Sequence, residues 1–349
     1  MEQEENVRSG ISGWRLCRFC FLLFFLSLLA AGGWLYLYAV TPMAPGDDVG
    51  RTVVIPPGAS LSGIQRILVK EELVADDFRF RLLARLLQVG RRLQAGEYHL
   101  AKNLSPAQLL FEIESGRIVQ RPVTIPEGVN LKEVAAILAS GGWLGQEEFL
   151  RLVRDPDFVR RQMRVDAATL EGYLFPDTYY LTRGMQGREI VAMMVARLRT
   201  MLGELGIDRE GKVGQGLTLH QVLTLASIVE KETAAPSERP LIAQVFLNRL
   251  QRGMRLQTDP TVIYGLASFD GNLTRKDLRT PTPYNTYIIK GLPPGPIGNP
   301  GRASIEAVLN PAEGSYLYFV SKNDSTHYFS KSLAEHNRAV RKYQKYPRR

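Results

Sequence analysis

The feature that most constrains this chain is a charge-free, almost continuously apolar segment near its N-terminus, Phe19–Val40. As an α-helix, its 22 residues extend about 33 Å, enough to cross the hydrocarbon core of a bilayer, which is about 30 Å thick. Trp34, Tyr36 and Tyr38 lie near the end of the segment, where amphipathic rings favour the headgroup region. A cleaved signal peptide has a shorter apolar core of about 7–15 residues. We therefore expect an uncleaved transmembrane helix.

The charges that flank this segment predict its orientation. Arg8, Arg15 and Arg18 precede it, whereas two aspartates follow it. Because basic residues stay on the cytoplasmic side, residues 1–18 are expected in the cytoplasm and residues 41–349 outside. We thus expect a single-pass protein of the cytoplasmic (inner) membrane, whose folded part is periplasmic where an outer membrane exists.

Composition limits the classes of partner and cofactor. The 349 residues carry 44 basic and 35 acidic side chains, a net charge of +9, and 45% of them are hydrophobic, as in an ordinary globular protein. Because the positive charge is spread over an extracytoplasmic region, we expect no nucleic acid partner; anionic lipid headgroups or an acidic polymer of the cell envelope suit it better. The two cysteines lie together in the N-terminal segment and the four histidines are scattered, so we expect no metal site and no cofactor.

An internal near-repeat follows the apolar segment. Residues 53–68 and 123–138 share seven of sixteen positions at an offset of 70. Each copy predicts a strand, a Pro-x-Gly turn and an amphipathic helix that begins after a small polar residue, Ser60 or Asn130. A second strand over 95–100 and a second helix over 105–116 are expected between the copies. Small units of this kind resemble LysM-like modules, which bind glycan chains. An ordinary positioning domain fits the same pattern.

A helix predicted to begin after Thr218 ends in two glutamates, Glu230 and Glu232. Side chains two residues apart on a helix point about 200° from each other, so the two carboxyl groups cannot enter the same cleft. Glu232 lies over Ile228 and Val229 on the apolar flank, where burial raises the pKa of a carboxyl group, as a general acid near neutral pH requires. Glu232 is therefore the candidate acid; two solvated residues at a helix end are the alternative. The polar face is expected to comprise Thr224, Ser227 and Lys231.

Two polar segments precede loops that could form the walls of a cleft. In residues 291–301, eight of eleven positions are Gly or Pro, and so much ordered loop suggests a shaped site. Neutral polar side chains offer hydrogen-bond donors and acceptors to a hydroxyl-rich ligand. A surface loop without a binding role is the alternative. The candidate substrate-binding residues are Gln257, Thr258 and Asp259 in one segment and Tyr284, Asn285 and Thr286 in the other.

Several long motifs occur in one order along the second half of the chain: EGYLFPDTYY (171–180), LASIVEKET (225–233), MRLQTDPTVIYG (254–265), TPYNTY (282–287) and GLPPGPIGNPG (291–301). Through them the chain resembles the YceG-like endolytic murein transglycosylases (the MltG family). The resemblance implies cleavage of the β-1,4 bond between N-acetylmuramic acid and N-acetylglucosamine within a peptidoglycan strand. It also implies that Glu232 is the catalytic residue and that the six polar residues above belong to the cleft.

The resemblance further implies lyase chemistry. The muramyl 6-hydroxyl attacks its own anomeric carbon and leaves a 1,6-anhydro end, while Glu232 serves first as acid and then as base. A membrane anchor would restrict the enzyme to nascent strands, whose elongation it would terminate, and peptidoglycan synthases are the expected protein partners. Two alternatives stay open: a glycoside hydrolase that uses Glu232 with Asp259, and a non-catalytic glycan-binding scaffold for cell-wall synthases.

The predicted fold class is α+β: an N-terminal transmembrane helix, one or more small LysM-like α/β modules, and a larger mixed α+β catalytic domain with a loop-lined cleft. The predicted boundaries are 1–18 for the cytoplasmic N-terminus, 19–40 for the transmembrane helix, 41–50 for a tether, 51–155 for the LysM-like or positioning region with the near-repeat, and 156–349 for the catalytic domain.

Overall fold

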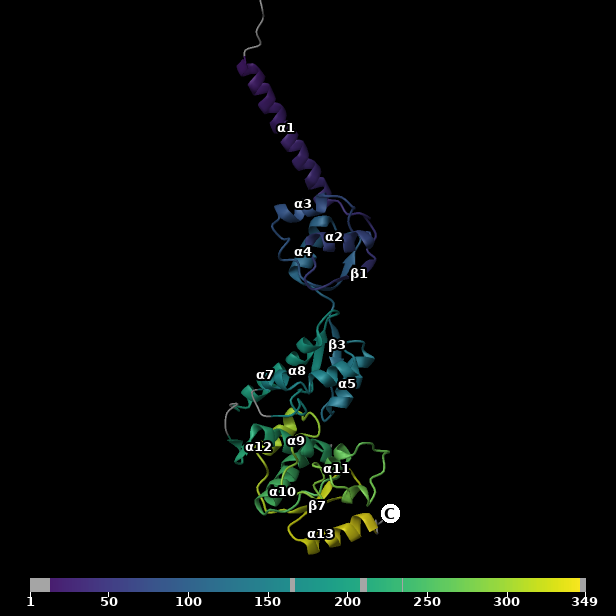
Figure 1. The fold of residues 1–349 in the computed structure, drawn as a ribbon, viewed down its shortest axis with the longest axis vertical. Helices are drawn as coiled ribbons and strands as arrows, with labels where there is room; N and C mark the ends of the chain where they lie inside the picture. The colour runs from purple at the N-terminus through teal and green to yellow at the C-terminus, as the bar shows by residue number, and fades with distance from the viewer. Residues whose placement is uncertain (1–12, 164–166, 208–211, 234, 346–349) are drawn as a thin grey trace, which may run out of the picture. The chain divides into compact units, whose positions relative to one another are not determined.

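The chain folds into two compact units, each with helices and short antiparallel strand pairs (Figure 1). The computed structural model describes residues 13–163, 167–207, 212–233 and 235–345. Most of the predicted cytoplasmic segment, including Arg8, lies outside the described residues. The first unit comprises Met1–Gln120 with Thr182–Gly184, and the second comprises Arg121–Leu181 with Met185–Arg349.

The first unit contains one strand pair covered by three short helices. Strands β1 and β2 are antiparallel, with a register that runs from Gly50 opposite Ala101 to Ile55 opposite Gly96. Its core includes the fully buried side chains of Leu68, Phe80, Tyr98, Leu109 and Ile113. The elements are α1 (Gly13–Val40), β1 (Gly50–Ile55), α2 (Leu61–Lys70), α3 (Arg79–Leu86), β2 (Gly96–Ala101) and α4 (Pro106–Ser115).

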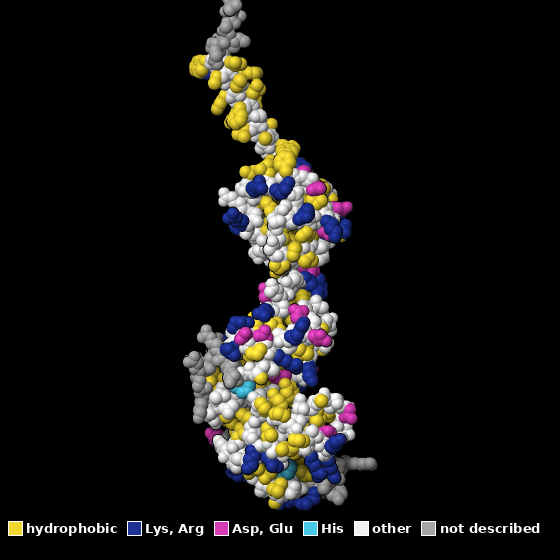
Figure 2. Space-filling view, viewed as in Figure 1, with side chains coloured by type: hydrophobic (Ala, Val, Ile, Leu, Met, Phe, Trp, Pro, Cys, Tyr) yellow, Lys and Arg dark blue, Asp and Glu magenta, His cyan; other side chains and the backbone are white. Residues whose placement is uncertain are grey.

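Helix α1 contains the apolar segment and, within the described residues, is the one helix long and apolar enough to cross a membrane. Hydrophobic side chains cover much of its length (Figure 2). Its last turn is different, because Tyr38 and Ala39 are buried in the core of the first unit. The guanidinium of Arg79 lies 4.3 Å from the centre of the Tyr38 ring. The helix therefore packs directly on the folded unit before the segment expected to be a tether begins.

The second unit is larger and holds a single hydrophobic core. It begins with β3 (Arg121–Thr124), which pairs antiparallel with β4 (Thr178–Leu181). Its helices are α5 (Leu131–Ser140), α6 (Gln146–Leu152), α7 (Pro156–Met163), α8 (Gly187–Glu204), α9 (Leu219–Glu232), α10 (Arg239–Gln251), α11 (Asp259–Gly265), α12 (Arg302–Leu309) and α13 (Leu333–Val340). The remaining strands are β5 (Lys212–Gly214), β6 (Leu217–Thr218), β7 (Tyr318–Ser321) and β8 (His327–Ser330).

The two copies of the near-repeat lie in different units. The first copy forms β1 and α2, and the second forms β3 and α5, each helix beginning after a small polar N-cap, Ser60 or Asn130. The division of the chain after Gln120 thus places residues 121–155 in the second unit, whereas the predicted boundary at 155 grouped them with the first copy. The physical reason is that β3 pairs with β4 and that α5 buries its apolar face in the second core.

Helix α9 lies at the centre of the second unit and carries both glutamates at its C-terminal end. Thr218 caps its start and forms a capping box with Gln221, as the predicted N-cap required. The expected polar face is wrong for Thr224 and Ser227, which are both 1% exposed. The loop before α12 covers this side of the helix, and the amide of Ile297 donates a hydrogen bond to the hydroxyl of Ser227. Helix α9 is therefore buried on nearly all sides.

Candidate functional site

Glu232, the last residue of α9, lines a cavity of about 490 Å³ in the second unit. The cavity is formed by α10, the start of α11, the β7–β8 pair and α13, so segments from many parts of the sequence meet there. Its other polar walls include Arg249, Gln257, Asp259, Tyr287, Tyr318 and His327.

The surroundings of Glu232 raise the pKa of its carboxyl group towards neutral pH. Burial raises the pKa of Glu232 to about 7, and the negative charge of Asp259 acts in the same direction. The hydroxyl of Thr258 donates a hydrogen bond to the Glu232 carboxylate and, with the charges of His327 and Arg249, limits the rise. At neutral pH the group can therefore both give and take a proton, which is the property of a general acid–base catalyst.

Glu230 has a different environment although it lies only two residues earlier. Its Oε1 accepts a hydrogen bond from Arg239 at 3.0 Å, and its Oε2 accepts one from the amide of Gly301 at 2.9 Å. Its side chain is 6% exposed and does not line the Glu232 cavity. The alternative of two solvated helix-end residues is therefore wrong for both glutamates. Glu230 serves as a buried anion that ties α9 to α10 and to the start of α12.

The segment before α11 alternates between the cavity and the interior. Gln257 has a φ of 50°, in the left-handed region, and its amide donates to the carbonyl of Thr286 at 3.2 Å. Thr258 is 2% exposed, and its amide donates to the hydroxyl of Thr286 at 3.0 Å. Gln257 and Asp259 thus line the cavity, while Thr258 lies behind it and contacts the acid.

The second polar segment does not line the cavity. Asn285 is fully buried; its Nδ2 donates to three backbone carbonyls and its Oδ1 accepts from the amide of Tyr287. Thr286 is fully buried too, and its hydroxyl lies 2.8 Å from that of Thr261. Tyr284 packs on another tyrosine with ring centres 4.8 Å apart. These three residues hold the loop in place, and the loop delivers Tyr287, whose hydroxyl donates to Asp259 at 2.7 Å.

Several polar cavity residues, among them Tyr287, Arg249, Tyr318 and His327, are not among the candidate site residues predicted from the sequence. Tyr287 follows directly after the second polar segment, so extending that segment by one residue would have found it. Arg249 is 7% exposed and donates to the carbonyls of Leu256 and Leu317. His327 lies 2.6 Å from a carboxylate oxygen of Glu238. No spacing in the sequence connects Arg249 or His327 with Glu232, because only the packing of α10 and β8 brings them together.

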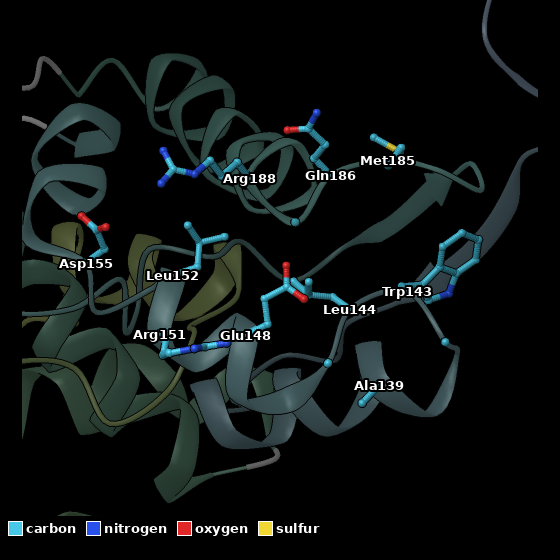
Figure 3. A pocket seen from close by; sticks show the side chains of 13 residues that line it. Ala139, Trp143, Leu144, Glu148, Arg151, Leu152, Asp155, Met185, Gln186 and Arg188 are labelled. Carbon is cyan, nitrogen blue, oxygen red and sulfur yellow. The ribbon is translucent and has the colours of Figure 1, made fainter. Parts of the chain in front are cut away.

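Among the further cavities of the second unit, two in the described residues are larger than the Glu232 cavity. The larger, about 830 Å³, is open to solvent and is formed by the α5–α6 connection, α6 and the start of α8. Figure 3 shows Glu148, Arg151, Gln186 and Arg188 around it, and none of the predicted site residues lines it. The other, about 590 Å³, lies along α11 and includes Lys231. Within the described residues no group of three or more His, Cys, Asp or Glu side chains could hold a metal ion.

A glutamic acid with a pKa raised to about 7, in a polar cavity with aromatic walls, defines a site for acid–base chemistry. This chain belongs to the YceG-like family, whose model matches residues 53–342. It is 33% identical to the endolytic murein transglycosylase of Bacillus subtilis over 330 residues, which cover 89% of this chain and 90% of that protein. It is also 33% identical to the endolytic murein transglycosylase of Streptococcus pneumoniae, covering 91% of this chain and 63% of that protein.

A solved structure agrees with this family assignment. The crystal structure of a YceG-like protein from Listeria monocytogenes matches 83% of this chain and 98% of its own, with 34% sequence identity and a TM-score of 0.55. The mixed α+β architecture is thus shared with a family member.

Proposed function

We propose that this protein is a membrane-anchored lytic transglycosylase that cleaves the bond between N-acetylmuramic acid and N-acetylglucosamine within peptidoglycan strands. The observation that carries the proposal is the Glu232 carboxyl group, which lies in the cavity with a pKa of about 7. The names of the relatives, endolytic murein transglycosylases, support the substrate. Neutral and aromatic side chains in the cavity, such as Gln257 and Tyr287, suit a sugar ligand.

In the first step, protonated Glu232 donates its proton to the glycosidic oxygen. The bond between that oxygen and the muramyl anomeric carbon breaks, the oxygen leaves as a hydroxyl group, and positive charge develops on the sugar ring. Glu232 becomes a carboxylate at this point. The hydrogen bond from Thr258 and the positive charge of Arg249 stabilise that form, so both favour the step.

In the second step, the muramyl 6-hydroxyl attacks the anomeric carbon of its own ring and closes a 1,6-anhydro bond. The Glu232 carboxylate removes the proton of that hydroxyl and returns to its starting state. Because nucleophile and electrophile belong to one sugar, the attack has the proximity advantage of an intramolecular reaction. A single carboxyl group can therefore serve both steps.

A second candidate is hydrolysis, and the position of Asp259 favours it. Asp259 lines the same cavity as Glu232, and its charge contributes to the raised pKa of Glu232. A second carboxylate could activate water or stabilise the positive sugar ring, as in glycoside hydrolases. The hydroxyl of Tyr287 donates to Asp259, which leaves the Asp259 carboxylate partly engaged.

Product analysis distinguishes the two reactions. Purified uncrosslinked glycan strands are digested with the full-length protein, and the products are identified by mass spectrometry. We expect 1,6-anhydro ends, and an Asp259→Asn variant should make the same ends. Products with only reducing ends would contradict the lyase and support the hydrolase, most clearly if Asp259→Asn abolished them.

The anchor and the first unit suggest where the reaction occurs. The α1 segment Leu16–Val40 is long enough to span a bilayer, and we propose that the N-terminus lies in the cytoplasm and both units outside. The enzyme would then meet strands as synthases extend them at the membrane and would terminate their elongation. We further propose that the first unit, with its β-α-α-β order, is a LysM-like glycan-binding module.

A scaffold without catalysis is the remaining alternative, and binding separates it from the enzyme. Isolated sacculi are incubated with full-length protein and with a variant that lacks residues 51–120. If sacculus binding required only this segment and no product formed, the scaffold would be favoured. If the variant still cleaved soluble strands, the enzyme would be favoured, and a simultaneous loss of sacculus binding would give the first unit a binding role.

A further inference from the structure

A second cavity is lined by residues that neighbour Glu232 and Asp259 in the sequence. It has a volume of about 590 Å³ and is lined by the start of α5, the end of α9 and α11. At the end of α9, Lys231 lines this cavity and Glu232 lines the other. At the start of α11, Asp259 lines the Glu232 cavity and Pro260 lines this one. The two cavities therefore flank the same pair of helix ends, and we refer to this one as the α11 cavity.

The α11 cavity is lined by exposed basic side chains and by carboxylates that already accept hydrogen bonds within the protein. Lys132, Arg154 and Lys231 are exposed, and in the part of the chain that the structure describes their side chains form no ion pair and no hydrogen bond. Glu133 accepts a hydrogen bond from the amide of Asn130 at 2.7 Å. The charge of Arg154 acts on Glu171, and all three basic side chains at the rim remain exposed to an anionic ligand.

The buried carboxylate of the cavity, Glu171, is occupied by internal partners. It accepts hydrogen bonds from the amide of Leu131 at 3.1 Å and from the hydroxyl of Tyr264 at 2.9 Å. Because burial raises its pKa to about 7, it carries only part of a negative charge near neutral pH. Its repulsion of an anionic ligand is correspondingly reduced.

Much of the remaining wall is apolar. Pro260, Ile263, Leu266, Phe269 and Ile297 line the cavity, and Phe269 is 42% exposed. Such a wall suits short aliphatic groups such as methyls. A ligand that fits the α11 cavity therefore carries carboxylates and small apolar groups together, which is the chemistry of a short alanine-containing acidic peptide.

We propose that the α11 cavity binds the peptide stem that is attached to the muramic acid residue at the cleaved bond. This inference rests on the proposed function, because the stem is part of a peptidoglycan substrate. The stem leaves the muramyl ring through the lactyl group on O3, and the anomeric carbon of the same ring carries the glycosidic oxygen that Glu232 protonates. A peptide bound beyond Lys231 and Pro260 would thus begin within one sugar ring of the acid, and its carboxylates would meet Lys132 and Arg154.

The experiment compares strands that keep their stems with the same strands after an amidase has removed them. Kinetics of the full-length protein in detergent are measured for the wild type and for Lys132→Ala/Arg154→Ala, which leaves the end of α9 unchanged. We expect the KM of the variant for stem-bearing strands to rise about tenfold, since exposed ion pairs are individually weak, and its KM for bare strands to change less than twofold. The difference should shrink at high salt.

A matched control keeps the net charge change constant. Arg275→Ala/Lys276→Ala removes two exposed cations of the same unit that line neither cavity, and it should leave both KM values unchanged. Binding of the free stem pentapeptide, measured by NMR titration, needs no turnover and should weaken in Lys132→Ala/Arg154→Ala alone. Equal KM changes on both kinds of strand, or unchanged peptide binding, would overturn the subsite. Failure of the wild type to cleave either strand would instead contradict the proposed function.

Discussion

Two glutamates on opposite sides of the C-terminal end of α9, Glu230 and Glu232, have very different environments. On one side, Glu230 meets a guanidinium and a backbone amide, so its charge is balanced by partners inside the protein. On the other, Glu232 faces a cavity, is bonded to the neutral hydroxyl of Thr258, and has a pKa raised to about 7. Full pairing makes a carboxylate structural, whereas incomplete pairing in a buried cavity leaves its proton available for chemistry.

Exchanging the acid for its amide tests the Glu232 side and should have the largest effect. In Glu232→Gln, the side chain can neither donate a proton to the glycosidic oxygen nor remove one from the 6-hydroxyl. General acid–base catalysis contributes about 10²–10⁴-fold, and because one group serves both steps we expect kcat to fall about 10³-fold or more. Release of soluble products from glycan strands measures the loss. Turnover at the wild-type rate would show that Glu232 is not the acid.

The same exchange on the other side should change stability rather than chemistry. Glu230→Gln removes the anion 3.0 Å from the nearly buried Arg239 guanidinium and leaves Glu127, 3.9 Å away, as its ion-pair partner; we expect a loss of about 3 kcal/mol in the free energy of unfolding. The kcat of the folded variant should change less than about threefold. Urea unfolding followed by circular dichroism measures the loss, and Glu230→Gln/Arg239→Met should restore part of it. If kcat fell as far as in Glu232→Gln, the contrast between the two sides would be wrong.

The pH dependence of stability distinguishes Glu232 from a paired carboxylate. Its pKa is raised from an ordinary value of 4.5 to about 7, so the folded protein holds a proton that the unfolded chain releases. The stabilisation is complete below pH 4.5 and is lost as the pH rises to about 7, an effect of about 3 kcal/mol. Because Glu171 is similarly shifted, unfolding measured from pH 4 to 8 should show about twice this decline in the wild type and about half of that total in Glu232→Gln.

The hydrogen bond from Thr258 adjusts the Glu232 side, and its removal should have the smallest effect. Thr258→Val keeps the shape but removes the donor, so the pKa of Glu232 should rise above about 7. The alkaline decline of kcat/KM should shift upward by less than about one pH unit, because burial is the larger cause. Thr261→Val is the matched control, since its hydroxyl contacts Thr258 and Thr286 and not the acid. An alkaline limb shifted equally in both variants would contradict the role of Thr258.

Local patterns predicted several parts of this molecule. The N-caps at Ser60, Asn130 and Thr218 are found at the predicted positions, because a cap depends only on the few residues that follow it. The opposite directions of Glu230 and Glu232 follow from helix geometry alone. The contacts of Glu230 do not follow from helix geometry, since its partners Arg239 and Gly301 lie in other segments of the chain.

Long-range packing decided the features that local patterns missed. Asn285 and Thr286 are neutral polar residues, as expected of a sugar-binding wall. Both are buried instead, and they hold the loop that brings Tyr287 to Asp259. Thr224 and Ser227 have the spacing of a solvent-facing side of a helix, but both are buried. The Ser227 hydroxyl accepts a hydrogen bond from a loop more than sixty residues later, and the Thr224 hydroxyl donates one to the carbonyl of His220. In each case a polar side chain finds its hydrogen bonds inside the protein, and sequence does not distinguish an internal partner from water.

The sequence by itself determined a membrane-length apolar helix, a strand–turn–helix unit that occurs twice, and a helix whose final glutamates diverge. Chain connectivity and the 100° rotation per residue are sufficient for those features. The tertiary structure alone decided that the second copy joins the larger unit, that Arg249 and His327 meet Glu232, and that a second cavity lies along α11. These depend on which distant apolar faces pack together, because burial, and with it the pKa of Glu232, is a property of the assembled core.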